Sequence, residues 1–140
     1  IPRLAISIQP DDSKRLDRVC QMIVELMEHR WIRDRVMVIS TSDEALALIE
    51  HRAPFLPRTR AGWFGTEADL DVARSMRCRA IAVPLATCSP VLVQEAHARE
   101  LEVIGWQGNT TDEVKAFMAL GVDALVTDFP TVAKRALGRV

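Results

Sequence analysis

The sequence has no long apolar run, no strong net charge and few cysteines. No apolar segment approaches the roughly 18 residues that a membrane-spanning helix needs, and no segment resembles a signal peptide. A formal charge of −1 provides no field that would attract nucleic acid or anionic lipid. Cys20, Cys78 and Cys88 are odd in number and lack metal-site spacing, so we expect reduced thiols, packed as small apolar groups in a cytoplasmic protein. These absences argue against a membrane protein, a nucleic-acid-binding protein and a disulfide-rich domain.

The bulk composition is that of a soluble globular chain. The 140 residues are 49% hydrophobic and 26% charged, which is enough for one domain with a hydrophobic core. The chain begins at Ile1 instead of Met and goes directly into an apolar run, which suggests a fragment or an upstream part not included here. We therefore expect residues 1–140 to form a single partial domain.

Six short apolar runs alternate with amphipathic segments along the whole chain. Each run ends in turn or capping residues, a pattern that is typical of buried strands followed by helices. The alternation predicts a parallel α/β fold. The expected strands are 4–9, 36–39, 61–64, 80–83, 103–106 and 124–126.

Several helix ends are marked by capping residues. Thr110 followed by Glu113 forms a predicted capping box, and Gly121 stands where a left-handed C-cap would fall. Ser89 precedes Pro90 as an expected N-cap, and Asp128 is most simply a cap for a helix that starts at Pro130.

The aromatic and histidine residues outside the C-terminal third have plain structural interpretations. We expect Trp31 and Trp63 to be packing residues. His29, His51 and His97 all fall in predicted helices, where they are expected at the surface or at an interface and not as catalytic groups.

The C-terminal third resembles the last two strand–helix units of the glycerophosphodiester phosphodiesterase family. The resemblance rests on Trp106 with Asn109, on the run 121–123, and on the run 127–130, which ends in Pro130. The family usually has Thr-Val between the Trp and the Asn, where this chain has Gln-Gly. Two weaker similarities lie upstream: run 6–9 matches the apolar frame of the family's third strand, and run 40–43 matches the end of its fourth.

The resemblance implies a partial TIM barrel of about six βα units, equivalent to strands three to eight of the family's barrel. Family members use a divalent cation (Ca²⁺ or Mg²⁺), carboxylate ligands and two histidines to hydrolyse glycerophosphodiesters in lipid metabolism. The histidines and two of the carboxylates belong to the first two units, which this sequence does not contain. Ser7 stands at the position of the third carboxylate, a Glu, and Gln9 stands at the position of a Lys that neutralises the phosphate.

These two replacements predict a degenerate site. A hydroxyl and an amide carry no charge, so they would bind neither a cation nor a phosphodiester strongly. We therefore expect no catalytic residue and no metal ligand in this chain. The candidate substrate-binding residues are Trp106, Asn109 and Gln9. Two alternatives stay open: Trp106 is either a pocket wall for glycerol or a core aromatic, and Asn109 either bonds a ligand or shapes a turn.

Two functions are consistent with these features. The first is hydrolysis of a small phosphodiester substrate, with the catalytic groups supplied by missing N-terminal units. The second is a catalytically inactive barrel module that binds a phosphate-containing ligand or a partner chain. In either case six strands leave two unpaired edges, so we expect packing against the missing N-terminal barrel units or self-association.

Overall fold

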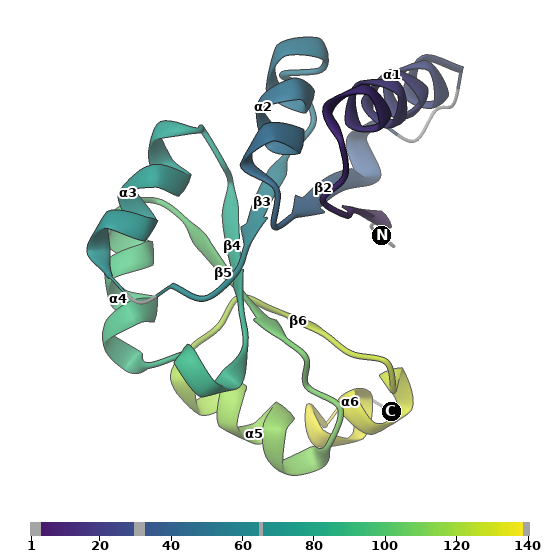
Figure 1. The fold of residues 1–140 in the computed structure, drawn as a ribbon. Coiled ribbons are helices and arrows are strands. Elements are labelled where there is room, and N and C mark those ends of the chain that lie inside the picture. The colour runs from purple at the N-terminus through teal and green to yellow at the C-terminus, as the bar shows by residue number, and fades with distance from the viewer. Residues whose placement is uncertain (1–3, 30–32, 65, 139–140) are drawn as a thin grey trace.

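The computed structural model describes residues 4–29, 33–64 and 66–138. Six parallel strands lie side by side in chain order and curl into an open arc, with the helices on its convex side (Figure 1). The strands are β1 (Leu4–Ile8), β2 (Val36–Ser40), β3 (Arg58–Ala61), β4 (Ala80–Val83), β5 (Glu102–Trp106) and β6 (Ala124–Val126). The helices are α1 (Ser13–His29), α2 (Asp43–Arg52), α3 (Glu67–Ser75), α4 (Pro90–Ala98), α5 (Thr111–Leu120) and α6 (Pro130–Ala136). This arrangement confirms the predicted partial barrel of βα units.

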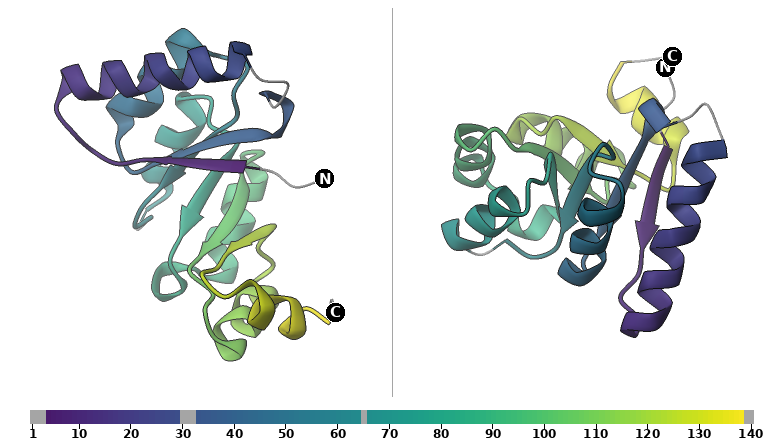
Figure 2. Two further views of the ribbon diagram at one scale, coloured as in Figure 1. Left: turned by 90° about the vertical axis from the view of Figure 1, so that its right-hand side faces the viewer. Right: turned by 90° about the horizontal axis from the view of Figure 1, so that it is seen from above.

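The sheet is built only from neighbours in sequence. Every pair from β1–β2 to β5–β6 is parallel, and the registers advance in step, for example Ile6 with Val38 and Ile104 with Ala124. Within the described residues β1 pairs only with β2, and β6 only with β5. The arc therefore has two free edges, and the two ends of the chain lie on its open side (Figures 1 and 2).

Local sequence signals explain most of the helix ends. The Thr110 hydroxyl accepts a hydrogen bond from the Glu113 amide at 3.2 Å, and the Glu113 carboxylate accepts one from the Thr110 amide at 3.2 Å. Gly121 ends α5 with a φ of +83°, and the Ser89 hydroxyl accepts from the Leu92 amide at 3.1 Å ahead of α4. The capping box, the glycine C-cap and the Ser-Pro start are confirmed.

The third strand lies earlier than predicted. Residues 58–61 form β3, whereas 61–64 was expected, because Arg58 and Arg60 do not resemble strand-core residues. Arg58 is nevertheless only 4% exposed, and its guanidinium donates to the Leu56 carbonyl at 3.2 Å and to the Arg77 carbonyl at 3.1 Å. A buried cation is tolerated here because carbonyl oxygens accept from its two terminal nitrogens, whereas its Nε is buried without a partner among the described residues.

Trp31 and Trp63 were both expected to be packing residues. Trp63 lies beyond β3 and is 71% exposed, so the packing role expected for it is wrong. Trp31 lies outside the described residues.

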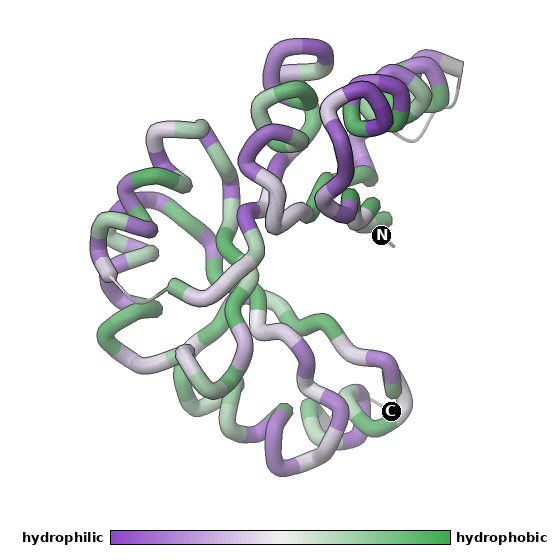
Figure 3. Tube along the Cα trace, in the orientation of Figure 1, coloured by the Kyte–Doolittle hydropathy of each residue, from purple (hydrophilic) through white to green (hydrophobic). Residues whose placement is uncertain are grey.

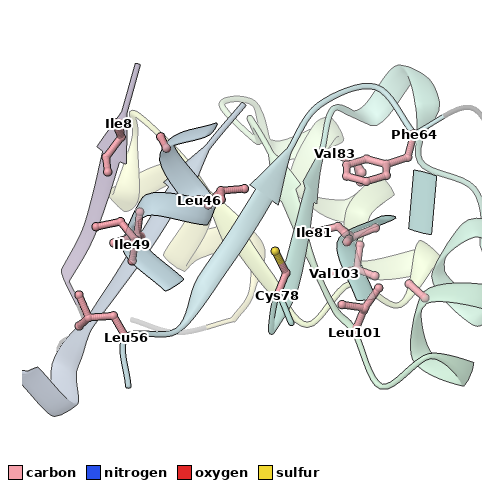
Figure 4. Packing of buried hydrophobic residues seen from close by; sticks show 14 of the residues in the cluster. Ile8, Leu46, Ile49, Leu56, Phe64, Cys78, Ile81, Val83, Leu101 and Val103 are labelled. Carbon is pink, nitrogen blue, oxygen red and sulfur yellow. The ribbon is translucent and has the colours of Figure 1, made fainter. Parts of the chain in front are cut away.

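The hydrophobic core has two parts, one on each face of the sheet. The larger part fills the space between the convex face and the helices and includes Ile8, Ile49, Leu56, Phe64 and Val83 (Figure 4). The smaller part is on the concave face and consists of Ala61, Ala80, Ala82 and Ile104, with Met37, Ile39 and Val126 partly buried against it. Apolar residues are accordingly frequent along the strands, whereas hydrophilic and hydrophobic residues alternate along the helices (Figure 3).

The three cysteines are free and buried, as expected of reduced thiols packed as small apolar groups. Burial raises the pKa of the thiols of Cys20, Cys78 and Cys88. No helix in the part of the chain that the structure describes is both long enough and apolar enough to cross a membrane.

Candidate functional site

A cavity of about 300 Å³ opens on the concave face, toward the carboxyl ends of the strands. This volume is at the lower limit of about 300 Å³ for small-molecule pockets. We call it the mouth cavity. All six strands contribute to it, and its lining residues are Ala5, Ser7, Ile8, Gln9, Ile39, Ser40, Thr41, Ala61, Ala82, Trp106 and Val126.

None of the described residues that line the mouth cavity is charged. Its polar groups are the side chains of Ser7, Gln9, Ser40 and Thr41. The Gln9 amide donates to the Ser7 hydroxyl at 3.2 Å. Ser40 is 2% exposed, and its hydroxyl donates to the Ile8 carbonyl at 2.6 Å and accepts from the Ser42 amide at 3.0 Å. The Ser40 hydroxyl is therefore already engaged in hydrogen bonds to backbone groups. Ser7 and Gln9, in contrast, are exposed at the rim of the cavity.

Trp106 forms one wall of the mouth cavity. It is the last residue of β5 and is 37% exposed, so a large part of its ring is covered and the rest remains accessible. The position at a strand end brings Trp106, Ser7 and Gln9, which are about 100 residues apart in the chain, to the lining of one cavity.

Asn109 does not line the mouth cavity but joins the loops that follow β5 and β6. Its amide nitrogen donates to the Asp128 carboxylate at 2.9 Å, and its amide oxygen accepts from the Asp128 amide at 2.9 Å and from the Thr127 hydroxyl at 3.3 Å. These bonds fix the loop that follows Trp106. Asp128 was expected to cap α6, but the N-cap is Phe129 and the Asp128 carboxylate bonds Asn109 instead.

The charged side chains near the strands point away from the mouth cavity or lie at the other end of the sheet. Arg60, near the end of β3, donates to Asp43 at the start of α2 at 2.8 and 3.2 Å, and this hydrogen bond with the carboxylate raises the pKa of the guanidinium. Arg79 and Glu102 pair at 3.5 Å in a hollow at the amino ends of the strands. The ion pair between Arg60 and Asp43 could not be predicted from the sequence, because the charge pattern alone does not indicate which face of the sheet a strand residue occupies.

The three histidines do not contribute to the mouth cavity where their side chains are described. His51 is exposed on α2, and the His97 Nε2 lies 2.8 Å from the Asp123 carboxylate, which also accepts from the Val103 amide at the amino end of β5. The side chain of His29 lies outside the described residues.

The donor set of the mouth cavity does not fit a divalent cation. Ca²⁺ and Mg²⁺ take several oxygen ligands, commonly carboxylates, and the cavity offers only hydroxyl and amide oxygens. Within residues 4–29, 33–64 and 66–138 no three His, Cys, Asp or Glu side chains gather as a group that could hold a metal ion. No catalytic step through a cation is therefore derived from these residues.

Comparison with known proteins agrees with the geometry. The model of the glycerophosphoryl diester phosphodiesterase family matches residues 3–132, so this chain belongs to that family. No curated protein was found to match the chain.

Solved structures with the same fold include enzymes of this family. A glycerophosphodiester phosphodiesterase from Parabacteroides distasonis superposes with a TM-score of 0.85 at 15% identity. The superposition covers 97% of this chain and 57% of the Parabacteroides chain. A phosphodiesterase from Oleispira antarctica, solved with the product sn-glycerol-3-phosphate, gives 0.85 at 15% identity, covering 96% and 56%. A thiamine phosphate pyrophosphorylase from Pyrococcus furiosus reaches only 0.51 at 10% identity, covering 94% and 78%. At these identities the superpositions show the fold alone, and this chain spans a little over half the length of the two phosphodiesterases.

Proposed function

We propose that this chain is the C-terminal part of a glycerophosphodiester phosphodiesterase domain, in which it binds the uncharged glycerol part of the substrate. The observation that carries the proposal is the mouth cavity: it lies at the carboxyl ends of the strands, where TIM-barrel enzymes place their sites, yet its described lining is neutral and mostly apolar. The family membership supplies the reaction class.

Each candidate residue has a distinct role in this proposal. The accessible part of the Trp106 ring covers the carbon skeleton of the alcohol. Ser7 and Gln9 exchange their mutual hydrogen bond for bonds to its hydroxyl groups. Asn109, which lies outside the cavity lining, acts indirectly: its side-chain bonds to Thr127 and Asp128 fix the loop after Trp106.

The charged half of the reaction belongs outside these residues. In this proposal a divalent cation, its carboxylate ligands, the phosphate-neutralising cation and the acid–base groups come from additional βα units. When bound, a divalent cation polarises the phosphate and stabilises charge in the transition state. The neutral cavity complements it by orienting the glycerol part of the substrate, which stays attached to the phosphate when the other alcohol leaves. Cytoplasmic location and a role in lipid metabolism are part of the same proposal.

Hydrolysis by the complete protein tests this function. We expect the complete protein to release glycerol phosphate from glycerophosphocholine when Mg²⁺ or Ca²⁺ is added. We expect no release when a chelator is added instead. Two variants test the role of Trp106 in substrate binding. Trp106→Ala should raise KM, whereas Trp63→Ala, which changes a tryptophan outside the cavity, should not.

A second candidate is favoured by Ser7 and Gln9. They stand where the family resemblance places a Glu and a Lys, and two charges lost together are expected of a module that no longer catalyses hydrolysis. A complete protein that releases no glycerol phosphate under any cation, but still binds sn-glycerol-3-phosphate, would establish this inactive binding module.

A further inference from the structure

The loop that follows Trp106 packs directly on strand β6. Gly108 is buried in this loop, and a Cβ atom added to it would lie 2.7 and 2.9 Å from the two methyl carbons of Leu125 and 3.1 Å from its Cγ. Carbon atoms in contact normally stay about 3.5–4.0 Å apart. No side chain therefore fits at position 108 while the loop and Leu125 keep their places.

The need for glycine at position 108 comes from this contact and not from the backbone conformation. Among the described residues the glycines with a positive φ are Gly62, Gly121 and Gly138, so Gly108 is not held in the left-handed region. Rotation about the last side-chain torsion of Leu125 moves its methyl groups but leaves its Cγ close to position 108. The loop itself must therefore move, or Leu125 must take another χ1 rotamer, when a side chain is added.

Trp106 lies between two such close approaches. On its other side, a Cβ atom added at Gly105 would lie 2.6 Å from the ring of Phe117. Gly105 and Leu125 are register partners in the sheet, and Phe117 and Leu125 both pack in the core between the sheet and the helices. The two glycines thus let the chain approach the helix layer before and after Trp106, whereas Trp106 itself lines the mouth cavity on the concave face.

Hydrogen bonds hold the loop on the far side of Gly108. The Gly108 amide donates to the carbonyl of Val126, which also lines the mouth cavity, at 2.9 Å. The Asn109 amide donates to the Glu113 carboxylate at 2.8 Å, in addition to the side-chain bonds between Asn109 and the loop after β6. Because Asn109 is anchored in this way, a displacement of Gly108 is passed to the chain on its other side. Trp106 lies within about 8 Å of backbone on that side.

We propose that Gly108 is a positioning residue for Trp106. The absence of a side chain at position 108 lets the loop rest on Leu125, and this contact sets how far the Trp106 ring enters the mouth cavity. The effect of Gly108 on ligand binding rests on the function proposed above, in which Trp106 covers the glycerol, but its effect on the position of the ring does not. Gly108 also departs from the Thr-Val that the family usually has here, and in this chain Leu125 takes the space that such a valine would need.

An exchange of bulk between positions 108 and 125 tests the proposal in the complete protein. Gly108→Val adds as many carbons as Leu125→Ala removes, and the atoms of Leu125 that lie nearest to position 108 are all absent from alanine. Gly108→Val alone should therefore displace the loop, and the double variant should restore it. Gln107→Val is the matched control, because it places the same side chain at an exposed position of the same loop.

Tryptophan fluorescence measures the position of Trp106 without a ligand. The signal of Trp106 is the difference between each variant and the same variant carrying Trp106→Phe. Because Trp106 is 37% exposed, a displaced ring that becomes largely exposed should be quenched by acrylamide about twofold more strongly in Gly108→Val. Gln107→Val and the double variant should be quenched as the unchanged protein is. Unchanged quenching in Gly108→Val, or an increase that Leu125→Ala does not reverse, would overturn the proposal.

A smaller substitution keeps the measurement informative if the valine variant does not fold. Gly108→Ala adds a single methyl group, whose carbon is the Cβ atom that meets Leu125. The same increase in quenching, smaller in size, is expected for it, and Leu125→Ala should again reverse it. No increase in a folded Gly108→Ala protein would count against the proposal in the same way.

Calorimetry with sn-glycerol-3-phosphate and with inorganic phosphate gives the consequence for binding. Gly108→Val should bind sn-glycerol-3-phosphate about fivefold more weakly and inorganic phosphate as before, and the double variant should regain the original affinity. An equal loss for both ligands would overturn the positioning role, since it indicates a general distortion of the site. A ring that moves while both affinities stay unchanged would support the positioning by Gly108 and contradict the proposed binding of glycerol by Trp106.

Discussion

The hydroxyl of Ser40 joins two strands and a loop at the rim of the mouth cavity. It donates to the Ile8 carbonyl of β1 and accepts from the Ser42 amide, which leads into α2. From the sequence, Ser40 is part of a run that resembles the end of a family strand. In the structure its side chain is bonded to the backbone, so its effect on the site is indirect.

Replacing Ser40 by Ala should therefore reduce stability. The Ile8 carbonyl and the Ser42 amide would each lose a buried partner, at a cost of about 1–3 kcal/mol. Urea unfolding of the protein measures this loss. Ser75→Ala is the matched control, because Ser75 is exposed and its hydroxyl bonds the Val72 carbonyl within its own helix, so a change within about 0.5 kcal/mol is expected. Equal effects of the two substitutions would contradict the bridging role of Ser40.

At the level of elements, β3 shows how a strand that carries two arginines is accommodated in a sheet covered by helices. Arg58 extends under the end of α3 and donates to the Arg77 carbonyl, while Arg60 turns to Asp43 at the start of α2. The two arginines connect the central strand to the helices on either side of it.

Arg58→Met tests this connection. Methionine retains the apolar stem but removes the donors, so the carbonyls of Leu56 and Arg77 lose their bonds, with an expected destabilisation of about 2–3 kcal/mol. Equilibrium unfolding in urea gives the value. Arg15→Met serves for comparison because that side chain is 73% exposed, and a loss as large in Arg15→Met as in Arg58→Met would refute the explanation.

The same strand shows which features the sequence could and could not predict. Five strands and the capped helices follow from apolar runs and capping residues, which are local signals. The position of β3 depends on carbonyl groups supplied by residues 56 and 77, and the role of Asp128 depends on Asn109 from another loop. These are tertiary contacts that no local pattern encodes. For the site, the sequence proposed Trp106, Asn109 and Gln9 as binding residues. The fold brings Trp106 and Gln9 to one cavity, with Ser7 beside them, and places Asn109 outside its lining.

At the level of the whole molecule, the buried thiols predict a loss of stability at alkaline pH. Burial raises their pKa above the ordinary value of 9.0, so the folded state resists thiol deprotonation more than the unfolded state does. This contribution is fully present below pH 9 and is lost as the pH rises through the raised pKa values. The chain has no tyrosine, which removes another group that would titrate near pH 10.

The melting temperature between pH 8 and pH 10.5 measures this effect. The protein should lose stability over that range, and the triple variant Cys20→Ala, Cys78→Ala, Cys88→Ala should show a shallower decline from its own lower starting value. Parallel declines would mean that the thiols do not cause the loss.

The whole chain separates neutral from charged surfaces. The described mouth of the arc is lined by neutral side chains. Ion pairs lie outside this lining: Arg60 with Asp43 between β3 and α2, Arg99 with Asp71 between helices, and Arg79 with Glu102 at the amino ends of the strands. In the function proposed above, this separation divides the substrate: the glycerol binds to this chain, and the phosphate binds to groups outside it.

The affinity of the complete protein for two ligands tests this division most directly. Calorimetry with sn-glycerol-3-phosphate and with inorganic phosphate is compared between the unchanged protein and Trp106→Ala. The ligands share the phosphate and differ in the glycerol, so the variant should bind sn-glycerol-3-phosphate about tenfold more weakly, a loss of about 1.4 kcal/mol, and should bind inorganic phosphate as before. An equal loss for both ligands, or no loss for either, would contradict the assignment of the alcohol to the mouth cavity.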